Sequence, residues 1–287
     1  MSANRREFLK MTGAGLSGVF LQPSLGESSS SSGSEDSMAM LYDATICVGC
    51  KACQTACKRR SDLPPELDSS GLFDAPPDLS ADTWTLIKLY KKDPQTFSFV
   101  KVQCMHCVDP ACVGVCPVGA LEKSDEGPVT YDENKCFGCR YCMAACPFDI
   151  PKYEWDKVLP LIQKCDFCDD RQEQGLNPSC GDACPTGALI YGKRGDLLEV
   201  AKSRIKDNPG KYVDHIYGEN EIGGTSMLYI SHVPFEEIGF PKLDSNSLPD
   251  RAWPYMAAVP GIVVGVGGLM SAIYWVTKRR MDAGEEE

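Results

Sequence analysis

The strongest hydrophobic pattern in the chain is an uninterrupted run near its C-terminus. Residues 252–277 are 26 positions without a charged side chain, and most of them are apolar. A helix of this length can cross the ~30 Å hydrocarbon core of a bilayer. Trp253 and Tyr255 at one end, and Tyr274 and Trp275 at the other, suit the two membrane interfaces. We therefore predict a transmembrane helix over residues 252–277.

The flanks of this run predict its orientation. Lys278, Arg279 and Arg280 follow at once, and basic flanks favour the cytoplasmic side, so we expect residues 278–287 to form a cytoplasmic tail. The run contains no His, Asp or Glu that would ligate haem or carry protons, which indicates an anchor. The alternative is a buried helix of a soluble protein, and the length and flanks argue against it.

Shorter apolar runs upstream predict strands. Residues 83–90 and 97–102 are β-like and are separated by the turn sequence Lys91-Lys92-Asp93-Pro94, which predicts a hairpin. Further extended stretches are expected at residues 40–43 and 227–233. The latter belongs to residues 207–250, whose glycines and prolines predict an extended arm packed on the part of the chain before it.

One longer helix is predicted before this arm. It should begin at a cap formed by Gly195-Asp196 and end near Lys206. Its core-facing side is expected to consist of apolar residues at helical spacing. These are Leu197, Leu198, Val200, Ala201 and Ile205.

At the N-terminus a basic pair precedes a mildly apolar, Gly-rich run. Arg5 and Arg6 are followed by Phe8-Leu9-Lys10, a pattern typical of a twin-arginine export signal, which we assign to residues 1–26. An ordinary basic N-terminus before a short amphipathic helix is the alternative. Residues 27–38 are Ser-rich, have too few apolar groups to fold, and are expected to form a linker.

Composition restricts the partners. The 287 residues carry a formal charge of −11 and have a pI near 4.9. This balance argues against nucleic acid as a partner. It does not select among protein partners, because an acidic surface is usually just a solvated one.

All sixteen cysteines fall into four quartets. Residues 136–147 have the spacing C-x2-C-x2-C-x3-C-P, with which bacterial ferredoxins hold [4Fe–4S] clusters. The first quartet keeps this spacing but has Lys58 in place of the proline, and the second and fourth widen one spacer. The quartets are Cys47, Cys50, Cys53 and Cys57; Cys104, Cys107, Cys112 and Cys116; Cys136, Cys139, Cys142 and Cys146; and Cys165, Cys168, Cys180 and Cys184.

Three other uses of cysteine fit this pattern less well. Structural zinc uses paired C-x2-C knuckles and needs neither the third Cys nor the Cys-Pro ending. A disulfide framework would suit an exported protein but not four such repeats. A c-type haem needs C-x-x-C-H, and no pair here is followed by His, since His106 lies inside its pair. The sequence therefore predicts four [4Fe–4S] clusters.

An internal repeat predicts the architecture. Cys116-Pro117-Val118-Gly119-Ala120-Leu121 recurs as Cys184-Pro185-Thr186-Gly187-Ala188-Leu189. Each Cys-Pro is expected to open a short turn of helix, and each Gly-Ala-Leu to lead into a strand. We predict an α+β fold over residues 39–206, built from two ferredoxin-like modules of two clusters each, with an insertion at residues 58–103. The first and fourth quartets would form an outer module, and the second and third an inner one.

The ligand sets follow if the last Cys of each quartet crosses to the neighbouring cluster, as in two-cluster ferredoxins. Cluster 1 is then held by Cys47, Cys50, Cys53 and Cys184, and cluster 2 by Cys104, Cys107, Cys112 and Cys146. Cluster 3 is held by Cys136, Cys139, Cys142 and Cys116, and cluster 4 by Cys165, Cys168, Cys180 and Cys57. The spacing favours this crossing but leaves the pairing of quartets open.

The motifs together resemble those of four-cluster iron–sulfur subunits of respiratory oxidoreductases, such as formate dehydrogenase and dimethyl sulfoxide reductase. More narrowly, the chain is similar to the membrane-anchored subunit of hydrogenase-2 type [NiFe] hydrogenases. The matching residues are 40–43, 47–50, 103–110, 138–143 and 228–241, together with the signal and the single C-terminal span. The least similar parts are the insertion at residues 58–103 and the acidic tail after Arg280.

The resemblance implies an electron-transfer subunit that is not catalytic by itself. Electrons would pass between a periplasmic catalytic subunit, such as a hydrogenase, and a polytopic, quinone-reactive membrane subunit. The chain would be anchored in the lipid of the inner membrane on its periplasmic side after export by the twin-arginine route. Alternatives are the same role in a formate dehydrogenase, a polysulfide- or sulfoxide-type reductase or a cytochrome-linked complex, and a cluster-containing sensor or assembly protein.

Overall fold

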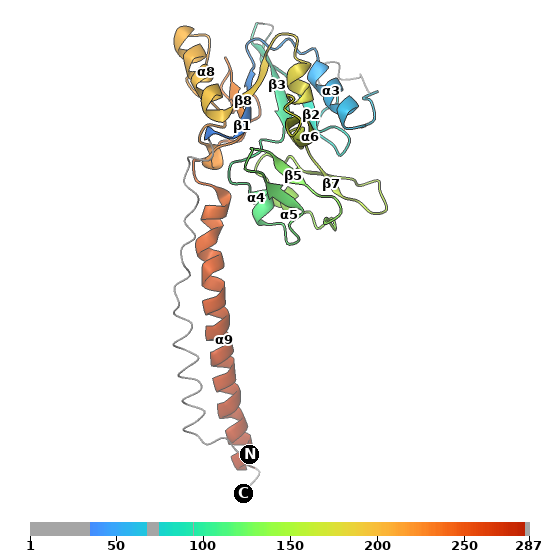
Figure 1. Ribbon diagram of the computed structural model, residues 1–287. Coiled ribbons are helices and arrows are strands. Elements are labelled where there is room, and N and C mark those ends of the chain that lie inside the picture. Colours follow the sequence, from blue (N-terminus) through green and yellow to red (C-terminus); the bar gives the residue numbers. More distant parts are fainter. Residues whose placement is uncertain (1–34, 68–74, 94, 285–287) are drawn as a thin grey trace. The chain divides into compact units, whose positions relative to one another are not determined.

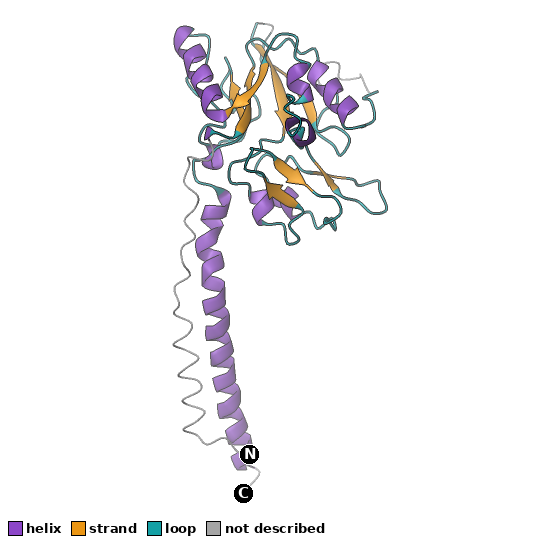
Figure 2. Ribbon diagram, viewed as in Figure 1, coloured by secondary structure: helices purple, strands orange, loops and turns teal. Residues whose placement is uncertain are grey.

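A computed structural model of the chain describes residues 35–67, 75–93 and 95–284. The expected signal, with Arg5 and Arg6, and most of the Ser-rich linker lie outside the described residues. Short strands and short helices joined by loops make up the cysteine-rich part (Figure 2). The strands are β1 (Met38–Asp43), β2 (Thr85–Lys91), β3 (Phe97–Gln103), β4 (Leu121–Lys123), β5 (Val129–Tyr131), β6 (Lys152–Tyr153), β7 (Ile162–Gln163), β8 (Leu189–Lys193) and β9 (Met227–Ile230). The helices are α3 (Ala52–Arg60), α4 (Ala111–Gly114), α5 (Tyr141–Ala145), α6 (Asp169–Gln172), α7 (Ser179–Asp182), α8 (Arg194–Asp207), the 3-10 turn η2 (Glu221–Gly223) and α9 (Leu248–Gly284).

A three-stranded sheet of order β8-β1-β9 joins the two ends of the cysteine-rich part. β1 pairs antiparallel with β8 and parallel with β9, so that Leu41 lies opposite Ile190 and Leu228. The arm over residues 207–250 was expected only to pack on the modules. It instead contributes β9 to this sheet, because Met227–Ile230 is a fully apolar-or-aromatic run that is buried at every position.

The two faces of this sheet pack against different parts of the chain, because successive side chains of a strand point to opposite faces. On one face Leu41, Leu228 and Ile230 pack against Leu197 of α8, which lies beside the sheet (Figure 1). On the other face lie Met40, Tyr42, Leu189, Met227 and Tyr229, and the partly buried Cys47, Cys53, Cys107 and Cys184 pack against this core. The sheet therefore supports the cysteine ligand loops on one side only.

Three antiparallel hairpins account for the other strands. The predicted hairpin is confirmed as β2-β3, in register from Thr85–Gln103 to Lys91–Phe97. The hairpin β4-β5 lies between the second and third quartets in the sequence, and the hairpin β6-β7 follows the third. β4 and β8 begin at Leu121 and Leu189, which confirms that each Gly-Ala-Leu of the internal repeat leads into a strand.

The expectation that each Cys-Pro opens a helix is wrong. The one-turn helices α4, α5 and α7 end just before Cys116, Cys146 and Cys184. The proline that follows each Cys lies in a turn. A residue before proline is pushed out of the α region, so the Cys terminates a helix instead of starting one.

α8 confirms the predicted helix with two corrections. It begins at Arg194, with Lys193 as its N-cap residue, so Gly195 and Asp196 lie inside its first turn. Leu197, Leu198 and Ala201 are buried as predicted. Val200 is 36% exposed and does not face the core.

α9 extends the predicted apolar span at both ends. Among the described residues it is the one helix long and apolar enough to cross a membrane, with a mean hydropathy of 1.9 over its best window. All side chains from residue 250 to 279 are exposed. An apolar helix this long with no covering protein contacts is suited to lipid or to partner helices.

Candidate iron–sulfur sites

The fold gathers the sixteen thiols into four groups, each drawn from two quartets. In the first group, which we call site 1, the four thiols line one pocket. These are Cys47, Cys50, Cys53 and Cys184. In site 3 the thiols of Cys116, Cys136, Cys139 and Cys142 line another pocket. In both cases one Cys comes from a different quartet than the other three.

Electrostatic neighbours identify the other two groups. The pKa of Cys107 is raised well above its ordinary value, first by burial and then by Cys104, Cys146 and Cys112, which with it form site 2. Burial raises the pKa of Cys57 to about 12, with further upward effects of Cys180 and Cys168. Cys165 interacts with both Cys57 and Cys180, and these four thiols form site 4.

The four sites follow one another in a row. Cys180 of site 4 interacts with Cys53 of site 1, and Cys165 of site 4 interacts with Cys104 of site 2. Cys112 of site 2 interacts with Cys142 of site 3. The order is therefore site 1, site 4, site 2, site 3.

The arrangement of the thiols suits iron–sulfur cubes. Four thiolates that each bind a different iron of a cube surround a space instead of meeting at a point. The sulfurs of sites 1 and 3 stand around such pockets, and among the described residues no three His, Cys, Asp or Glu are placed to hold a single ion. Burial raises the pKa of most of these thiols, which favours the protonated form. A bound metal centre stabilises the thiolates, and its binding releases their protons. The donor set therefore fits [4Fe–4S] clusters.

A shared backbone conformation shapes all four ligand loops. In each quartet the residue just before the second Cys has a positive φ: 67° at Gly49, 46° at His106, 74° at Gly138 and 64° at Phe167. The N–H groups of Gly49, Gly138 and Phe167 point at the first Cys sulfur of their quartet, at 3.5, 3.4 and 3.4 Å. Hydrogen bonds to cluster sulfurs are a recognised influence on reduction potential.

Two of these positions have room only for glycine. A Cβ at Gly49 would lie 2.3 Å from the ring of Phe99, and one at Gly138 would lie 2.7 Å from the backbone oxygen of Pro160. At both places glycine lets the backbone approach the sulfur of the first Cys. In the second and fourth quartets His106 and Phe167 occupy the same position, and their rings contact each other with centroids 4.6 Å apart. The spacing alone gave no sign of that contact.

The internal repeat places two sulfurs in similar clusters of N–H groups. Burial would raise the pKa of Cys116, but neighbouring backbone N–H groups stabilise its thiolate, and the net shift is downward. The N–H of Ala120 donates to the sulfur at 3.2 Å. Cys184 shows the same balance, with N–H groups of Leu189, Thr186 and Ala188. The repeated sequence thus forms the same thiolate-binding turn in each module.

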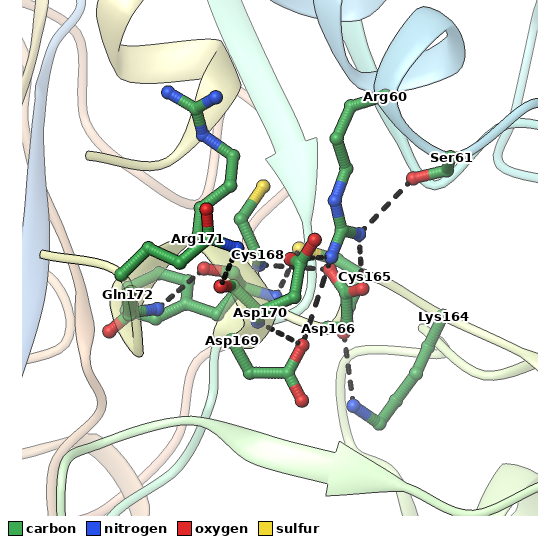
Figure 3. A network of polar contacts seen from close by, with 12 residues as sticks. Arg60, Ser61, Lys164, Cys165, Asp166, Cys168, Asp169, Asp170, Arg171 and Gln172 are labelled. Atoms are coloured by element: carbon green, nitrogen blue, oxygen red, sulfur yellow. Dashed lines mark hydrogen bonds and ion pairs between the residues drawn. The ribbon is translucent and has the colours of Figure 1, made fainter. Parts of the chain in front are cut away.

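Arg60 connects the first and fourth quartets, a role that the sequence analysis missed. It is the last residue of α3, and its guanidinium donates to Asp166, between Cys165 and Cys168, and to Asp170. Figure 3 shows Arg60 reaching from α3 toward these carboxylates. Asp166 also accepts a hydrogen bond from the N–H of Cys168 at 2.9 Å. The pair therefore holds the ligand loop of site 4 against the helix that carries Cys57.

Lysines lie buried among the thiols. Lys101 of β3 has an exposed fraction of 0% and Lys164 one of 4%. Burial alone would lower the pKa of Lys101, but Cys53, Cys180, Cys57 and Cys165 offset this, and its pKa is raised.

Comparison with known proteins agrees with this geometry. Residues 95–194 match the family model of a 4Fe-4S dicluster domain. The chain is 39% identical to a protein of Nitratidesulfovibrio vulgaris over 99% of this chain and 80% of that protein. It is 38% identical to the hydrogenase-2 operon protein HybA of Escherichia coli O157:H7, over 87% of each chain. It is 33% identical to the iron-sulfur subunit of the nitrate-inducible formate dehydrogenase of Escherichia coli K12, over 87% of this chain and 89% of that subunit.

These similarities extend over most of both chains, beyond the cysteine motifs. They agree with a fold whose described part has cysteine ligand loops on a small sheet. The chain belongs to the family of iron–sulfur electron-transfer subunits found in hydrogenase- and formate dehydrogenase-type complexes.

Proposed function

We propose that the chain relays electrons through four [4Fe–4S] clusters, one in each of sites 1 to 4. The electrons pass between a periplasmic catalytic subunit, with a [NiFe] hydrogenase as the favoured partner, and a quinone-reactive integral membrane subunit. A bound cluster of this kind supplies one-electron transfer. The residues of the chain hold each cluster, keep water from it and set its electrostatic surroundings.

The observation that carries the proposal is the grouping of all sixteen thiols into four adjacent sites. The crossing of Cys184 into site 1 and of Cys116 into site 3 supports the ligand sets expected from ferredoxins. A sensor needs only one labile cluster. Four neighbouring sites in a row are what a relay needs, because electron transfer depends on short steps between clusters.

The exposure of the sites indicates where redox partners would contact the row. All four thiols of site 4 are buried, whereas Cys50 of site 1 is exposed. Beside the terminal sites lie exposed apolar side chains, Val48 at site 1 and Phe137 and Tyr141 at site 3. These apolar side chains suit contact with redox partners, and site 4, within the row, is the site whose four thiols are all buried.

The anchor supports a membrane-side partner. α4, which carries Cys112 of site 2, contacts the start of α9. We therefore assign the inner-module end to the membrane subunit and the site 1 end to the catalytic subunit. The basic residues Lys278 and Arg279 favour a cytoplasmic C-terminus. The twin-arginine pattern Arg5-Arg6 favours export of the folded protein. Together they put the clusters on the periplasmic side of the membrane.

Purification of the tagged chain from membranes in mild detergent tests this proposal, with an untagged chain as the control. Mass spectrometry identifies partners, and iron, sulfide and zinc are measured on the same sample. We expect about sixteen iron ions per chain, together with a [NiFe] large subunit and a polytopic membrane protein. A molybdenum-containing partner with the same iron content would keep the relay and assign it to a formate dehydrogenase- or reductase-type complex. Zinc in place of iron, or iron without any partner, would overturn the proposal.

A further inference from the structure

Lys101 lies between the thiols of two different sites. Its side chain is completely buried on β3 and lines the pocket of site 1. Burial would lower the pKa of Lys101, but the thiols of Cys53 of site 1 and of Cys180, Cys57 and Cys165 of site 4 raise it. A single cationic side chain is thus shared by both sites of the outer module.

The charge of Lys101 has no carboxylate partner among the described residues. Its Nζ donates to Oγ1 of Thr85, whose hydroxyl donates in turn to Oε1 of Gln103 at 3.4 Å. A hydroxyl does not neutralise an ammonium group, and a buried charge is costly unless an anion compensates it. The anions within reach are the ligating thiolates of sites 1 and 4.

The two lysines near site 2 are held differently. The Nζ of Lys164 donates to the backbone oxygens of Val129 and Cys165, and the Nζ of Lys123 donates to those of Gly127 and His106. Carbonyl oxygens of the chain therefore satisfy both ammonium groups. Lys101 is the lysine whose surroundings are dominated by thiolates of two sites.

We propose that the buried ammonium of Lys101 is a charge shared by sites 1 and 4 that raises the reduction potentials of both clusters. This inference rests on the proposed function and on the ligand sets given above. Reduction adds one negative charge to a cluster, and a fixed positive charge beside it stabilises the reduced form. The effect is strong because the site is buried, where the dielectric constant is low and salt screens little.

Redox titration of the purified complex, followed by EPR spectroscopy, tests the role of Lys101. In Lys101→Met we expect the signals of sites 1 and 4 to titrate at lower potential, by at least a tenfold change in the reduction equilibrium constant, which is ~59 mV for one electron. Sites 2 and 3 should be unchanged. The signals of sites 1, 4, 2 and 3 are assigned with the variants Cys47→Ser, Cys180→Ser, Cys107→Ser and Cys139→Ser, in that order. The shift should persist at high salt because the charge is buried.

Two variants separate charge from structure. Lys101→Arg keeps the charge and should keep both potentials near those of the wild type. Lys91→Met removes one exposed lysine from the same hairpin and should change nothing. If Lys101→Met loses iron, Lys101→Gln, which retains a donor for Thr85, must show the same downward shift.

Unchanged potentials in the uncharged variants, equal shifts at all four sites, or the same shift in Lys101→Arg would overturn the inference. A wild-type protein without iron would instead overturn the proposed function itself. The two failures are therefore distinguishable in one set of samples.

Discussion

Gly138 shows, at the scale of one residue, how little room the ligand loops leave. Its φ of +74° is strained for any residue with a side chain, and an added Cβ would lie 2.7 Å from the backbone oxygen of Pro160. Gly138→Ala combines left-handed strain of about 1–2 kcal/mol with a clash against backbone that has no easy way to move. We expect site 3 to lose iron partly, measured as a lower iron-to-protein ratio and a weaker EPR signal from one cluster.

Gly119→Ala is the matched control for this change. Gly119 has a similar φ of +61° and lies in the turn that follows Cys116 of the same site, but nothing lies within 4 Å of its Cβ position. It carries the same backbone strain without the clash, and it should retain more iron than Gly138→Ala. Equal losses in the two variants would show that the contact with Pro160 is unimportant.

Single residues differ in how far the sequence could predict their part in the sites. The cysteines were predictable, because ligand spacing is local along the chain. Arg60 was not, since its partner Asp166 lies 106 residues away and the C-x2-C spacing around Asp166 says nothing about the residues between the cysteines. The burial of Lys101 was hidden for a related reason: its strand pattern allowed either face, and only the packing of the outer module decides which one is covered.

At the scale of elements, the contact between α3 and the loop of the fourth quartet is held by Arg60. Its side chain and that of Asp166 are 17% and 25% exposed, so the pair is largely shielded from water. Arg60→Met leaves Asp166 without its partner, at a cost of about 1–3 kcal/mol. We expect the midpoint temperature of cluster bleaching, followed by visible absorbance, to fall by several degrees.

The control for Arg60 is Arg171→Met. Arg171 pairs with Asp182 at 2.7 Å, but both residues belong to the fourth quartet's own loop, so no second quartet is attached through them. This variant should bleach close to the wild-type temperature. A larger loss in Arg171→Met than in Arg60→Met would contradict the role of Arg60 as the connection between quartets.

Because ligands cross between quartets, two cysteines close together at α7 should affect different clusters. Cys180 and Cys184 are neighbours on and just after α7, yet Cys180 belongs to site 4 and Cys184 lines site 1. Cys184→Ser should therefore disturb the same EPR signal as Cys47→Ser, while Cys180→Ser disturbs a different one. If Cys184→Ser and Cys180→Ser disturb one common signal, the crossing is wrong.

Elements with a strong local pattern were predictable, and those defined by distant pairing were not. The β2-β3 hairpin, α8 and the apolar run of α9 follow from turn residues and periodicity. The place of β9 beside β1 does not, because parallel pairing joins segments from opposite ends of the cysteine-rich part. Short helices were expected after Cys116 and Cys184 but lie before them, since Cys-Pro marks the end of a helix as readily as its start.

For the whole molecule, the boundary between the folded part and the apolar helix α9 lies at Ser247. This residue is 5% exposed, and its hydroxyl accepts a hydrogen bond from the N–H of Asp250 at the start of α9. Just before it, the backbone oxygen of Asp244 accepts a hydrogen bond from the N–H of Ile222 at 2.7 Å. The arm is therefore packed up to this point, whereas the side chains of residues 250–279 are exposed.

A stop codon after Ser247 should release the chain from the membrane without emptying its sites. The sixteen cysteines all precede this position, and the contact of α9 with the cysteine-rich part lies at its start, against α4, so the iron content should stay near that of the full chain. Fractionation by ultracentrifugation in cells lacking the partner subunits, with iron measured in both fractions, checks both halves of the prediction. As a control, replacing residues 252–277 by an unrelated apolar span should restore the membrane fraction, since lipid requires only length and hydrophobicity. A truncated chain that stays with the membrane, or that loses iron, would show that α9 does more than anchor the protein.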